Sequence, residues 1–250
     1  MRFRGKVVLV TGGGSGIGQA IARGFAREGA GVVVAGRSRE PLEQTVKLIS
    51  EEGGQAAAIT VDVTDSSDVA SLVHGIIERY CRLDIAVNCA GTFAVGSVVE
   101  MPEEEWTRVI ETNTTGVFYA MKHEIAAMRG AGQGVIVNVS SQVGLHRRFP
   151  GLSAYGASKA AVIALTRTAA LEYIREGIRI NAVSPGPHDT AMSMRPGETE
   201  ADRAARLKQQ LPIGRVGSLD EITGTVLWLA SDDAGFAVGH DLVVDGGSSI

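Results

Sequence analysis

The segment Thr11-Gly12-Gly13-Gly14-Ser15-Gly16-Ile17-Gly18 joins a short apolar run at residues 6–10 to a helical pattern at residues 19–28. A strand, a glycine-rich turn and a helix in this order form a phosphate-binding βα unit. The glycines let the backbone approach a pyrophosphate, and the helix N-terminus favours its negative charge. The spacing G-x-x-x-G-x-G differs from the common dinucleotide fingerprint G-x-G-x-x-G. The segment therefore predicts a nucleotide-binding α/β domain.

Apolar, strand-like runs alternate with helical patterns along the whole chain. The seven expected strands are residues 6–10, 32–35, 56–61, 84–87, 134–139, 178–183 and 242–244. Such runs are typical of strands buried on both faces, and the alternation indicates a parallel sheet. We therefore predict an α/β fold: a single doubly wound Rossmann-type domain over residues 1–250, with a parallel seven-stranded sheet and helices on both faces. The polar, weakly patterned residues around 187–212 are expected to form a substrate flap.

Composition excludes several classes of protein. The formal net charge is -4, so there is no basic surface of the kind that binds nucleic acid. No apolar run is long enough to cross a bilayer, and we expect no membrane partner. The two cysteines, Cys81 and Cys89, suit a reducing compartment and form no metal-ligand cluster. We therefore expect a cytoplasmic protein without a metal site.

The residues after the second expected strand bear on the choice of cofactor. They read Gly36-Arg37-Ser38-Arg39, where an NAD-binding domain places a carboxylate for the ribose hydroxyls. A guanidinium group matches phosphate oxygens with its planar set of donors, so Arg37 and Arg39 favour NADP(H) and its 2′-phosphate. NAD(H) remains the alternative, because arginines solvated at a helix start would give the same sequence and Ser15 adds no second basic residue to the glycine turn.

Tyr155 and Lys159 stand four residues apart in an alanine-rich, proline-free run that continues through Leu171. In a helix this spacing places both side chains on one face, one turn apart. A nearby ammonium group favours the phenolate and lowers the pKa of a tyrosine from its ordinary value of about 10. The pair therefore predicts a group that donates and accepts a proton. A plain helix with an exposed lysine is the other interpretation, because Y-x-x-x-K is a short pattern.

A second helical pattern, over residues 103–128, is interrupted at Asn113-Thr114-Thr115-Gly116. Polar residues and glycine lower helix propensity, so we expect a local break there. Such a break frees backbone groups that can hold a water molecule.

The glycine turn, Asn88-Cys89-Ala90-Gly91, Asn113, Ser141, Tyr155 with Lys159, and Pro185-Gly186 occur in one order along this pattern. In this combination the chain resembles the short-chain dehydrogenase/reductase family over essentially its whole length. Within the family it most resembles 3-oxoacyl carrier-protein reductases and small-molecule ketoreductases.

The resemblance implies a catalytic set of Asn113, Ser141, Tyr155 and Lys159. Tyr155 would be the general acid in ketone reduction and the base in alcohol oxidation. Lys159 would lower its pKa and bind the nicotinamide ribose. Ser141 would hydrogen-bond the substrate oxygen, and Asn113 would hold a water in a proton relay. Ser141 is preferred to its neighbour because the family's serine precedes an x-x-G turn, here residues 142–144, although the gap to Tyr155 is one residue longer than is common.

The resemblance also implies a cofactor site. The glycine turn would hold the pyrophosphate, residues 62–63 and 88–91 the adenine, and residues 185–190 the nicotinamide. The expected cofactor-binding residues are Gly12, Ser15, Gly16, Ile17, Gly18, Arg37, Asp62, Val63, Asn88, Ala90, Gly91, Tyr155, Lys159, Pro185, Gly186, His188 and Thr190. His188 stands where the family often has an aliphatic residue. Its backbone would keep the cofactor contact, and its ring would point to the substrate or to the flap.

These expectations describe an NADP(H)-dependent oxidoreductase that interconverts a ketone and a secondary alcohol, assembled as a homotetramer or homodimer. One alternative is an NAD(H)-dependent dehydrogenase of an alcohol, polyol or sugar. A more remote one is a non-catalytic dinucleotide sensor, although the catalytic set is complete. For the small-molecule carbonyl or alcohol substrate, Phe93, Phe149, Met192 and Met194 indicate an apolar wall, whereas His146, Arg147 and Arg148 indicate a polar or anionic end. Placement of these basic residues at the surface explains the sequence equally well.

Overall fold

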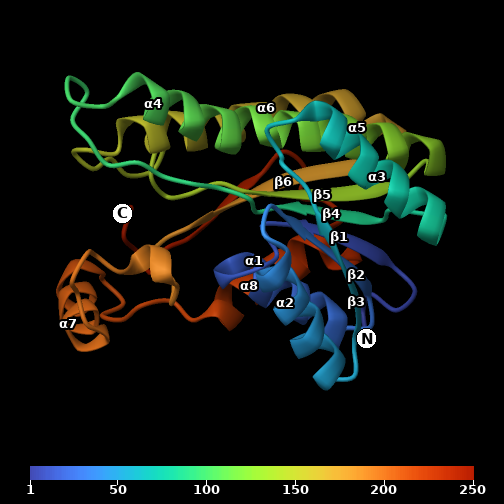
Figure 1. Cartoon of the computed structure of the whole chain (residues 1–250), viewed down its shortest axis with the longest axis horizontal. Coiled ribbons are helices and arrows are strands. Elements are labelled where there is room, and N and C mark those ends of the chain that lie inside the picture. Colours follow the sequence, from blue (N-terminus) through green and yellow to red (C-terminus); the bar gives the residue numbers. More distant parts are fainter.

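Seven parallel strands form one sheet, in the order β3-β2-β1-β4-β5-β6-β7, in the computed structural model, which describes residues 1–250 (Figure 1). The strands are β1 Val7–Thr11, β2 Gly31–Gly36, β3 Gln55–Thr60, β4 Ile85–Asn88, β5 Gly134–Val139, β6 Ile178–Pro185 and β7 Asp241–Val244. The chain builds outward from β1 to β3 and then returns to place β4 on the other side of β1. In open sheets of this kind ligands bind beyond the carboxyl ends of the strands, at this switch in direction. The predicted fold class is confirmed.

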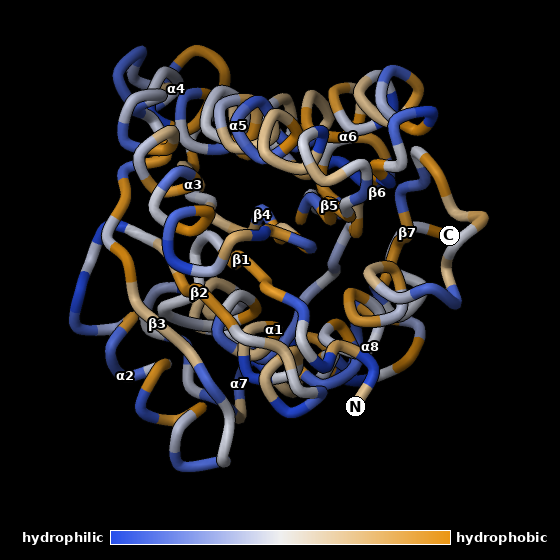
Figure 2. The backbone as a smooth tube through the Cα atoms, turned by 90° about the vertical axis from the view of Figure 1, so that its right-hand side faces the viewer, coloured by the Kyte–Doolittle hydropathy of each residue, from blue (hydrophilic) through white to orange (hydrophobic).

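Helices cover both faces of the sheet (Figures 1 and 2). One face carries α1 Gly16–Arg27, α2 Arg39–Glu51 and α8 Leu219–Ala230. The other carries α3 Ser66–Tyr80, α4 Glu103–Ile110, α5 Gly116–Ala131 and α6 Ser153–Tyr173. Three short 3-10 turns are Ile174–Glu176, Ala191–Ser193 and Asp232–Ala234. A last helix, α7 Glu200–Gln210, stands apart from both layers in the part of the chain predicted to be a flap.

The core lies in two halves, one on each side of the sheet. In β1, Val7 and Leu9 belong to the cluster under α3, α5 and α6, whereas Val8 and Val10 belong to the cluster under α1 and α8. Successive strand residues point to opposite faces, so a strand covered on both sides needs an uninterrupted apolar run. This explains why the strands are so visible in the sequence.

The expected break in the long helical pattern is present as a single π-helical turn. Residues Glu111–Thr115 form this turn between α4 and α5. Asn113 lies at its centre and is fully buried. Single π-helical turns inside α-helices are rare overall, and those that occur often lie at functional sites. The break therefore coincides with a candidate site residue.

A carboxyl group is buried on α5, in the centre of the molecule. Glu124 is completely buried, and Asn88 Nδ2 donates hydrogen bonds to Glu124 Oε2 and to Asn138 Oδ1, both at 3.0 Å. Glu124 Oε1 and Asn88 Oδ1 have no hydrogen-bond partner. Burial raises the pKa of Glu124 to about 7, because water no longer stabilises its charged form.

Replacing Glu124 with glutamine is expected to remove a pH dependence of stability. Because folding raises the pKa of Glu124, protonation of this residue stabilises the folded state. This stabilisation is complete below the ordinary pKa of 4.5 and is lost as the pH rises through about 7. The difference between these values corresponds to roughly 3 kcal/mol, at about 1.4 kcal/mol per pH unit. Urea unfolding at about pH 5 and pH 8 should therefore show Glu124→Gln gaining roughly 2–3 kcal/mol over the wild type at the higher pH.

The matched control is Glu111→Gln, because Glu111 lies on the same helical run but is exposed. That variant should differ from the wild type by the same amount at both pH values. The same constant difference in Glu124→Gln would contradict the account of the buried carboxyl.

Candidate active site

Tyr155 and Lys159 lie one turn apart near the start of α6, as predicted. The Lys159 Nζ is 5.9 Å from the centroid of the Tyr155 ring. Lys159 is buried, and its Nζ donates a hydrogen bond to the Val139 carbonyl oxygen at 2.8 Å, at the carboxyl end of β5. The alanine-rich sequence allows this part of α6 to lie close to the strand. The pair therefore stands at the edge of the sheet where the fold places ligands.

The pKa of Tyr155 differs from the sequence-based expectation. Lys159 was expected to lower it, but burial raises it, and a hydrogen bond from the Ser141 hydroxyl opposes this effect only in part. Burial also lowers the pKa of Lys159 to about 8, so both side chains favour their neutral forms more than they would in water. The phenol is consequently protonated at neutral pH, which is the state of a proton donor.

Two adjacent serines, Ser140 and Ser141, follow β5, and their hydroxyl groups bind different parts of the structure. Ser140 Oγ donates a hydrogen bond to the Lys159 carbonyl oxygen at 2.8 Å and thereby joins the strand end to α6. Ser141 Oγ accepts one from Val143 N at 3.1 Å and lies beside the Tyr155 phenol. Ser141 is thus the serine that lies nearer the phenol, and its role as the site serine stays a prediction.

The glycine of the turn after Ser141 is explained by a close approach to α6. Gly144 has φ +123°, and a Cβ on this residue would lie 2.7 Å from the Gly156 carbonyl oxygen. A side chain would therefore push the turn away from the first turn of α6. Gly144 thus keeps Ser141 close to Tyr155.

Asn113 fastens three parts of the site together. Its Oδ1 accepts from Thr92 N at 2.8 Å, while its Nδ2 donates to Thr92 O at 2.8 Å and to Ser158 Oγ at 2.9 Å. A Cβ on Gly91 would be 3.3 Å from Asn113 Oδ1 and 3.5 Å from Lys159 Nζ, so both groups border the same small space. Both amide hydrogens of Asn113 are used within the protein. A water beside it would therefore depend mainly on other groups, such as the main chain of the π-helical turn.

The glycine turn has the shape of a phosphate cradle. Gly12 has φ +68°, and a Cβ on it would lie 2.8 Å from Ala90 N, so the turn packs directly against the end of β4. Thr11 Oγ1 accepts hydrogen bonds from Cys89 N at 3.2 Å and Ala90 N at 3.3 Å. Beyond it α1 begins at Gly16, and the side chain of Ser15 makes no capping hydrogen bond. The first N–H groups of α1 are thus available to an anion, as a dinucleotide pyrophosphate requires.

Arg37 and Arg39 have different surroundings at the end of β2. Arg39 forms an ion pair with Glu43 at 2.6 Å. Arg37 is exposed and takes part in none of the hydrogen bonds or ion pairs of the structure. The pKa of Asp62 is lowered, mainly by hydrogen bonds from Thr64 and to a smaller extent by the charge of Arg37. Of the two, Arg37 is the one free to bind a phosphate.

The residues predicted to line the adenine site border a small hollow. Other residues, which were not predicted to belong to this site, complete its lining. Its lining comprises Thr11, Val63, Asn88, Ala90, Thr112, Gly116, Val117 and Ala120. Val63, Asn88 and Ala90 were predicted. The other five come from β1, the π-helical turn and α5. Their place in this lining was not predicted, because it depends on the packing of α5 against β4 and on the pairing of β4 with β1.

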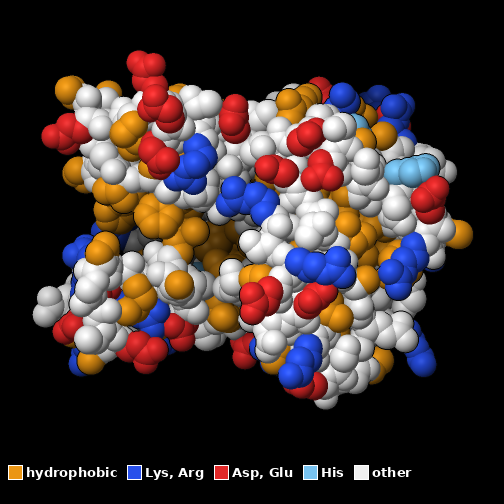
Figure 3. Space-filling model, in the orientation of Figure 1, with side chains coloured by type: hydrophobic (Ala, Val, Ile, Leu, Met, Phe, Trp, Pro, Cys, Tyr) orange, Lys and Arg blue, Asp and Glu red, His pale blue; other side chains and the backbone are white.

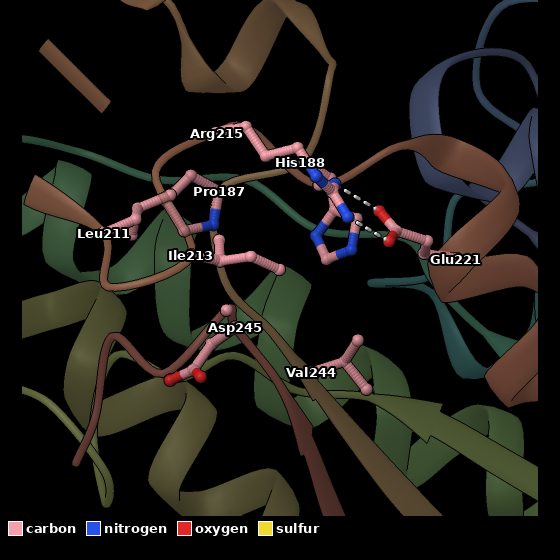
Figure 4. A pocket seen from close by; sticks show the side chains of 10 residues that line it. Pro187, His188, Leu211, Ile213, Arg215, Glu221, Val244 and Asp245 are labelled. Atoms are coloured by element: carbon pink, nitrogen blue, oxygen red, sulfur yellow. Dashed lines mark hydrogen bonds and ion pairs between the residues drawn. The ribbon is translucent and has the colours of Figure 1, made fainter. Parts of the chain in front are cut away.

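His188 points its ring toward the base of the flap (Figure 4). The ring is buried, and its Nδ1 is 3.0 Å from the Gly186 carbonyl oxygen. A Cβ on Gly217 would lie 2.8 Å from the ring, so the segment after α7 packs directly on it. The pocket of Figure 4, also lined by Leu211 and Ile213, therefore lies at the C-terminal end of residues 187–212, where we expect a flap. The ring thus lies against residues 211–217, and the role of His188 at the cofactor stays a prediction.

The remaining nicotinamide-end residues lie between β6, β7 and the glycine turn. Gly186 N donates to the Val244 carbonyl oxygen at 2.9 Å. A Cβ on Gly16 would be 3.3 Å from Thr190 Cγ2, so Thr190 lies over the glycine turn. The N–H of His188 makes no backbone hydrogen bond and is available to a ligand.

The basic residues of the loop before α6 are engaged at the C-terminal end of the chain. His146 Nε2 is 2.6 Å from Asp241 Oδ2, and Arg147 donates a hydrogen bond to Ser248. The expectation that these side chains provide a polar end for the substrate is therefore wrong for His146 and Arg147. Their partners lie about 100 residues away in the chain, beyond any local pattern.

No group of three or more histidine, cysteine, aspartate or glutamate side chains is arranged to hold a metal ion. None of the helices has the length and apolar character needed to cross a membrane.

Residues 12–249 match the protein family described as Enoyl-(Acyl carrier protein) reductase. A 3-oxoacyl-acyl-carrier-protein reductase of Thermotoga maritima is 38% identical over 247 residues, which cover 99% of each chain. Cyclohexanol dehydrogenase of Acinetobacter sp. is 40% identical over 98% of this chain and 95% of that protein.

Solved structures agree with the fold and with the arrangement of the whole chain. A short-chain type dehydrogenase/reductase from Mycobacterium marinum has a TM-score of 0.92 and 36% identity, over 99% of this chain and 96% of that one. An NAD+-bound xylitol dehydrogenase has a TM-score of 0.93 and 34% identity, over 99% and 100%. The chain belongs to the short-chain dehydrogenase/reductase family of oxidoreductases.

Proposed function

We propose that this protein is an NADP(H)-dependent oxidoreductase that interconverts a ketone and a secondary alcohol. The observation that carries the proposal is the convergence of Tyr155, Ser141 and Lys159 at the carboxyl end of β5, beside a glycine turn with free helix N–H groups. This arrangement offers a proton donor, a hydrogen-bond donor for a developing negative charge, and a buried cation.

The chemistry divides between the cofactor and the chain. The nicotinamide supplies a hydride to the carbonyl carbon when the cofactor is bound. Tyr155 donates its phenol proton to the carbonyl oxygen. Burial raises the pKa of the phenol, which keeps it protonated before the reaction but makes it a weaker acid, so the charge of Lys159 has to assist the transfer. Ser141 donates a hydrogen bond to the same oxygen and stabilises its developing charge. In alcohol oxidation the phenolate of Tyr155 accepts the hydroxyl proton.

Lys159 and Asn113 support this proton transfer. Lys159, with a pKa of about 8, is mostly protonated at neutral pH, so its charge stabilises the phenolate and its ammonium binds the nicotinamide ribose. Asn113 holds Thr92 and Ser158 in place around the lysine. A water at the π-helical turn would return the proton to Tyr155 through Lys159.

Arg37 is the basis for the cofactor preference. It is unpaired at the end of β2, and Gly36 leaves no carboxylate that would repel a 2′-phosphate. The main alternative is an NAD(H)-dependent dehydrogenase of an alcohol, polyol or sugar, and the likeness to an NAD+-bound xylitol dehydrogenase favours it. A non-catalytic dinucleotide sensor is the remote alternative; it would bind the cofactor but turn over no carbonyl compound.

Arg37→Ala is expected to weaken NADPH binding by about 10- to 100-fold, because hydrogen bonds to charged groups contribute about 1.5–3 kcal/mol each. NADH binding should stay within about twofold, since it lacks the 2′-phosphate that Arg37 would contact. Titration with each cofactor, followed by the fluorescence of the bound nicotinamide, measures both constants.

Arg39→Ala is the matched control for this titration, because Arg39 is occupied by Glu43. It should leave both constants nearly unchanged. Tighter binding of NADH than of NADPH by the wild type would contradict the cofactor assignment and favour the alternative.

We further propose that the protein is a cytoplasmic homotetramer, or a homodimer, as its family resemblance implies. Exposed apolar side chains on α5 and α6, Phe118 and Leu171, support an interface along these helices. Light scattering of the purified protein would measure the state, and a monomer would contradict it.

A further inference from the structure

Resting on the proposed carbonyl chemistry, we infer that the substrate is an uncharged ketone or secondary alcohol whose reacting carbon lies in or beside a bulky hydrocarbon group. Three features carry this inference. They are the aromatic ring beside Tyr155, the apolar side chains that continue from it, and the engagement of nearby basic side chains elsewhere.

Phe93 presents an apolar surface at the proton donor. Its ring centroid is 6.4 Å from that of Tyr155, at an interplanar angle of 77°, and 41% of the residue is exposed. The backbone around it is fixed, because Arg108 Nη2 donates to Phe93 O at 3.2 Å and Asn113 binds both backbone groups of Thr92. A substrate that reaches the phenol therefore lies against this ring. A hydroxyl group facing it would lose water without gaining a partner, at a cost of about 1–3 kcal/mol.

The apolar surface continues from Phe93 onto the loop before α6 and toward the flap. Gly96 N donates to Gly151 O at 3.0 Å, so the strip after Phe93 lies beside that loop. Val95, Phe149 and, on the flap, Met192 have 71%, 38% and 52% of their surface exposed. Figure 3 shows hydrophobic side chains around a hollow between the upper helical layer and the part of the molecule that carries α7. Apolar patches that line a hollow in this way are typical of ligand sites.

The nearby basic side chains of the loop are engaged elsewhere. The carboxylate of Asp241 accepts a hydrogen bond from Ser184 Oγ at 2.6 Å and lies 2.6 Å from His146 Nε2, which ties the histidine to the start of β7. Arg147 donates a hydrogen bond to Ser248, and its guanidinium carbon is 4.8 Å from the centroid of the Phe149 ring. The guanidinium group therefore packs on this ring.

Two basic side chains of the expected flap are also paired. Arg203 pairs with Asp189 at 2.6 Å, and Arg206 pairs with Glu198 at 2.6 Å. Arg148, Arg195 and Lys208 are without a side-chain partner, but they are exposed to water. A substrate carboxylate or phosphate placed in the hollow would therefore lose hydration without meeting a free buried cation other than Lys159. The free-energy cost of this lost hydration is larger than the stabilisation that an exposed ion pair provides.

The test compares two ketones of matched shape, 4-methylcyclohexanone and 4-oxocyclohexanecarboxylate, with NADPH and the wild-type protein. They differ in a methyl and a charged carboxylate at the same position. We expect kcat/KM for the methyl compound to be at least about tenfold higher, because the hollow offers the methyl group contact and the carboxylate no partner. Equal values, or a preference for the carboxylate, would overturn the inference while leaving the proposed function intact.

Variants of Phe93 connect this preference to the surface described. Phe93→Ser should lower kcat/KM for the methyl compound by about tenfold and reduce the preference; Phe93→Leu should restore most of it. Phe236→Ser, at a fully exposed ring after the last 3-10 turn, serves as the control and should leave the preference unchanged. A preference that survives in Phe93→Ser would overturn the role of this surface. Binding of NADPH without turnover of either ketone would instead contradict the proposed function, and the inference with it.

Discussion

Tyr155→Phe is expected to lower kcat for ketone reduction by about two to four orders of magnitude, the range typical of a removed general acid. The variant keeps the aromatic ring, so its packing against Phe93 and the start of α6 is retained. NADPH binding should remain within about twofold of the wild type, because the phenol hydroxyl is at most one of many groups around the cofactor. Steady-state rates with a saturating ketone and a cofactor titration measure the two quantities separately.

A tyrosine at the other end of the same helix provides the control. Tyr173 ends α6 and packs against Arg129, with 6.0 Å between the guanidinium carbon and the ring centroid. Tyr173→Phe should keep nearly full turnover. Full activity in Tyr155→Phe would exclude this residue as the proton donor, and equal losses in both variants would indicate a structural role.

Ser141→Ala is expected to lower kcat by about 100- to 1,000-fold, as is found when one donor to a developing oxyanion is removed. Its hydroxyl is the hydrogen-bonding neighbour of the Tyr155 phenol, and the substrate oxygen has to lie within reach of both groups. KM for the cofactor should change little, because the serine stands at the substrate side of the site. Measuring kcat and both KM values distinguishes a catalytic effect from weakened binding.

Ser140→Ala is the natural comparison, because Ser140 differs from Ser141 by a single position. Its hydroxyl donates to the Lys159 carbonyl oxygen, so its loss should cost about 0.5–1.5 kcal/mol of stability and little of kcat. A larger loss of kcat in Ser140→Ala than in Ser141→Ala would reverse the assignment of the two serines.

The sequence was sufficient to predict the fold because the sheet is parallel. Every central strand is covered on both faces, so runs such as Val7 to Val10 are apolar throughout and stand out from the helical patterns. The break at Asn113 was also predictable, because polar residues and a glycine interrupt an otherwise regular helix. Its form, a single π-helical turn, could not be predicted, because it depends on contacts with Thr92 and Ser158.

The site was predictable in its positions but not in its electrostatics. The four-residue spacing of Tyr155 and Lys159 places them correctly on α6. The sequence does not reveal that Lys159 binds the Val139 carbonyl or that burial, more than the lysine, determines the pKa of Tyr155. In the same way, His146 appears in the sequence as a basic loop residue, and only the tertiary structure brings Asp241 to it.

The central claim is that hydride passes from the nicotinamide to a carbonyl carbon at Tyr155. The most direct measurement is reduction of 4-methylcyclohexanone with NADPH that carries deuterium at both C4 positions, followed by mass spectrometry of the alcohol. We expect one deuterium on the carbinol carbon of the product and a rate that falls with Tyr155→Phe. Product without deuterium, or a rate that does not depend on Tyr155, would contradict it.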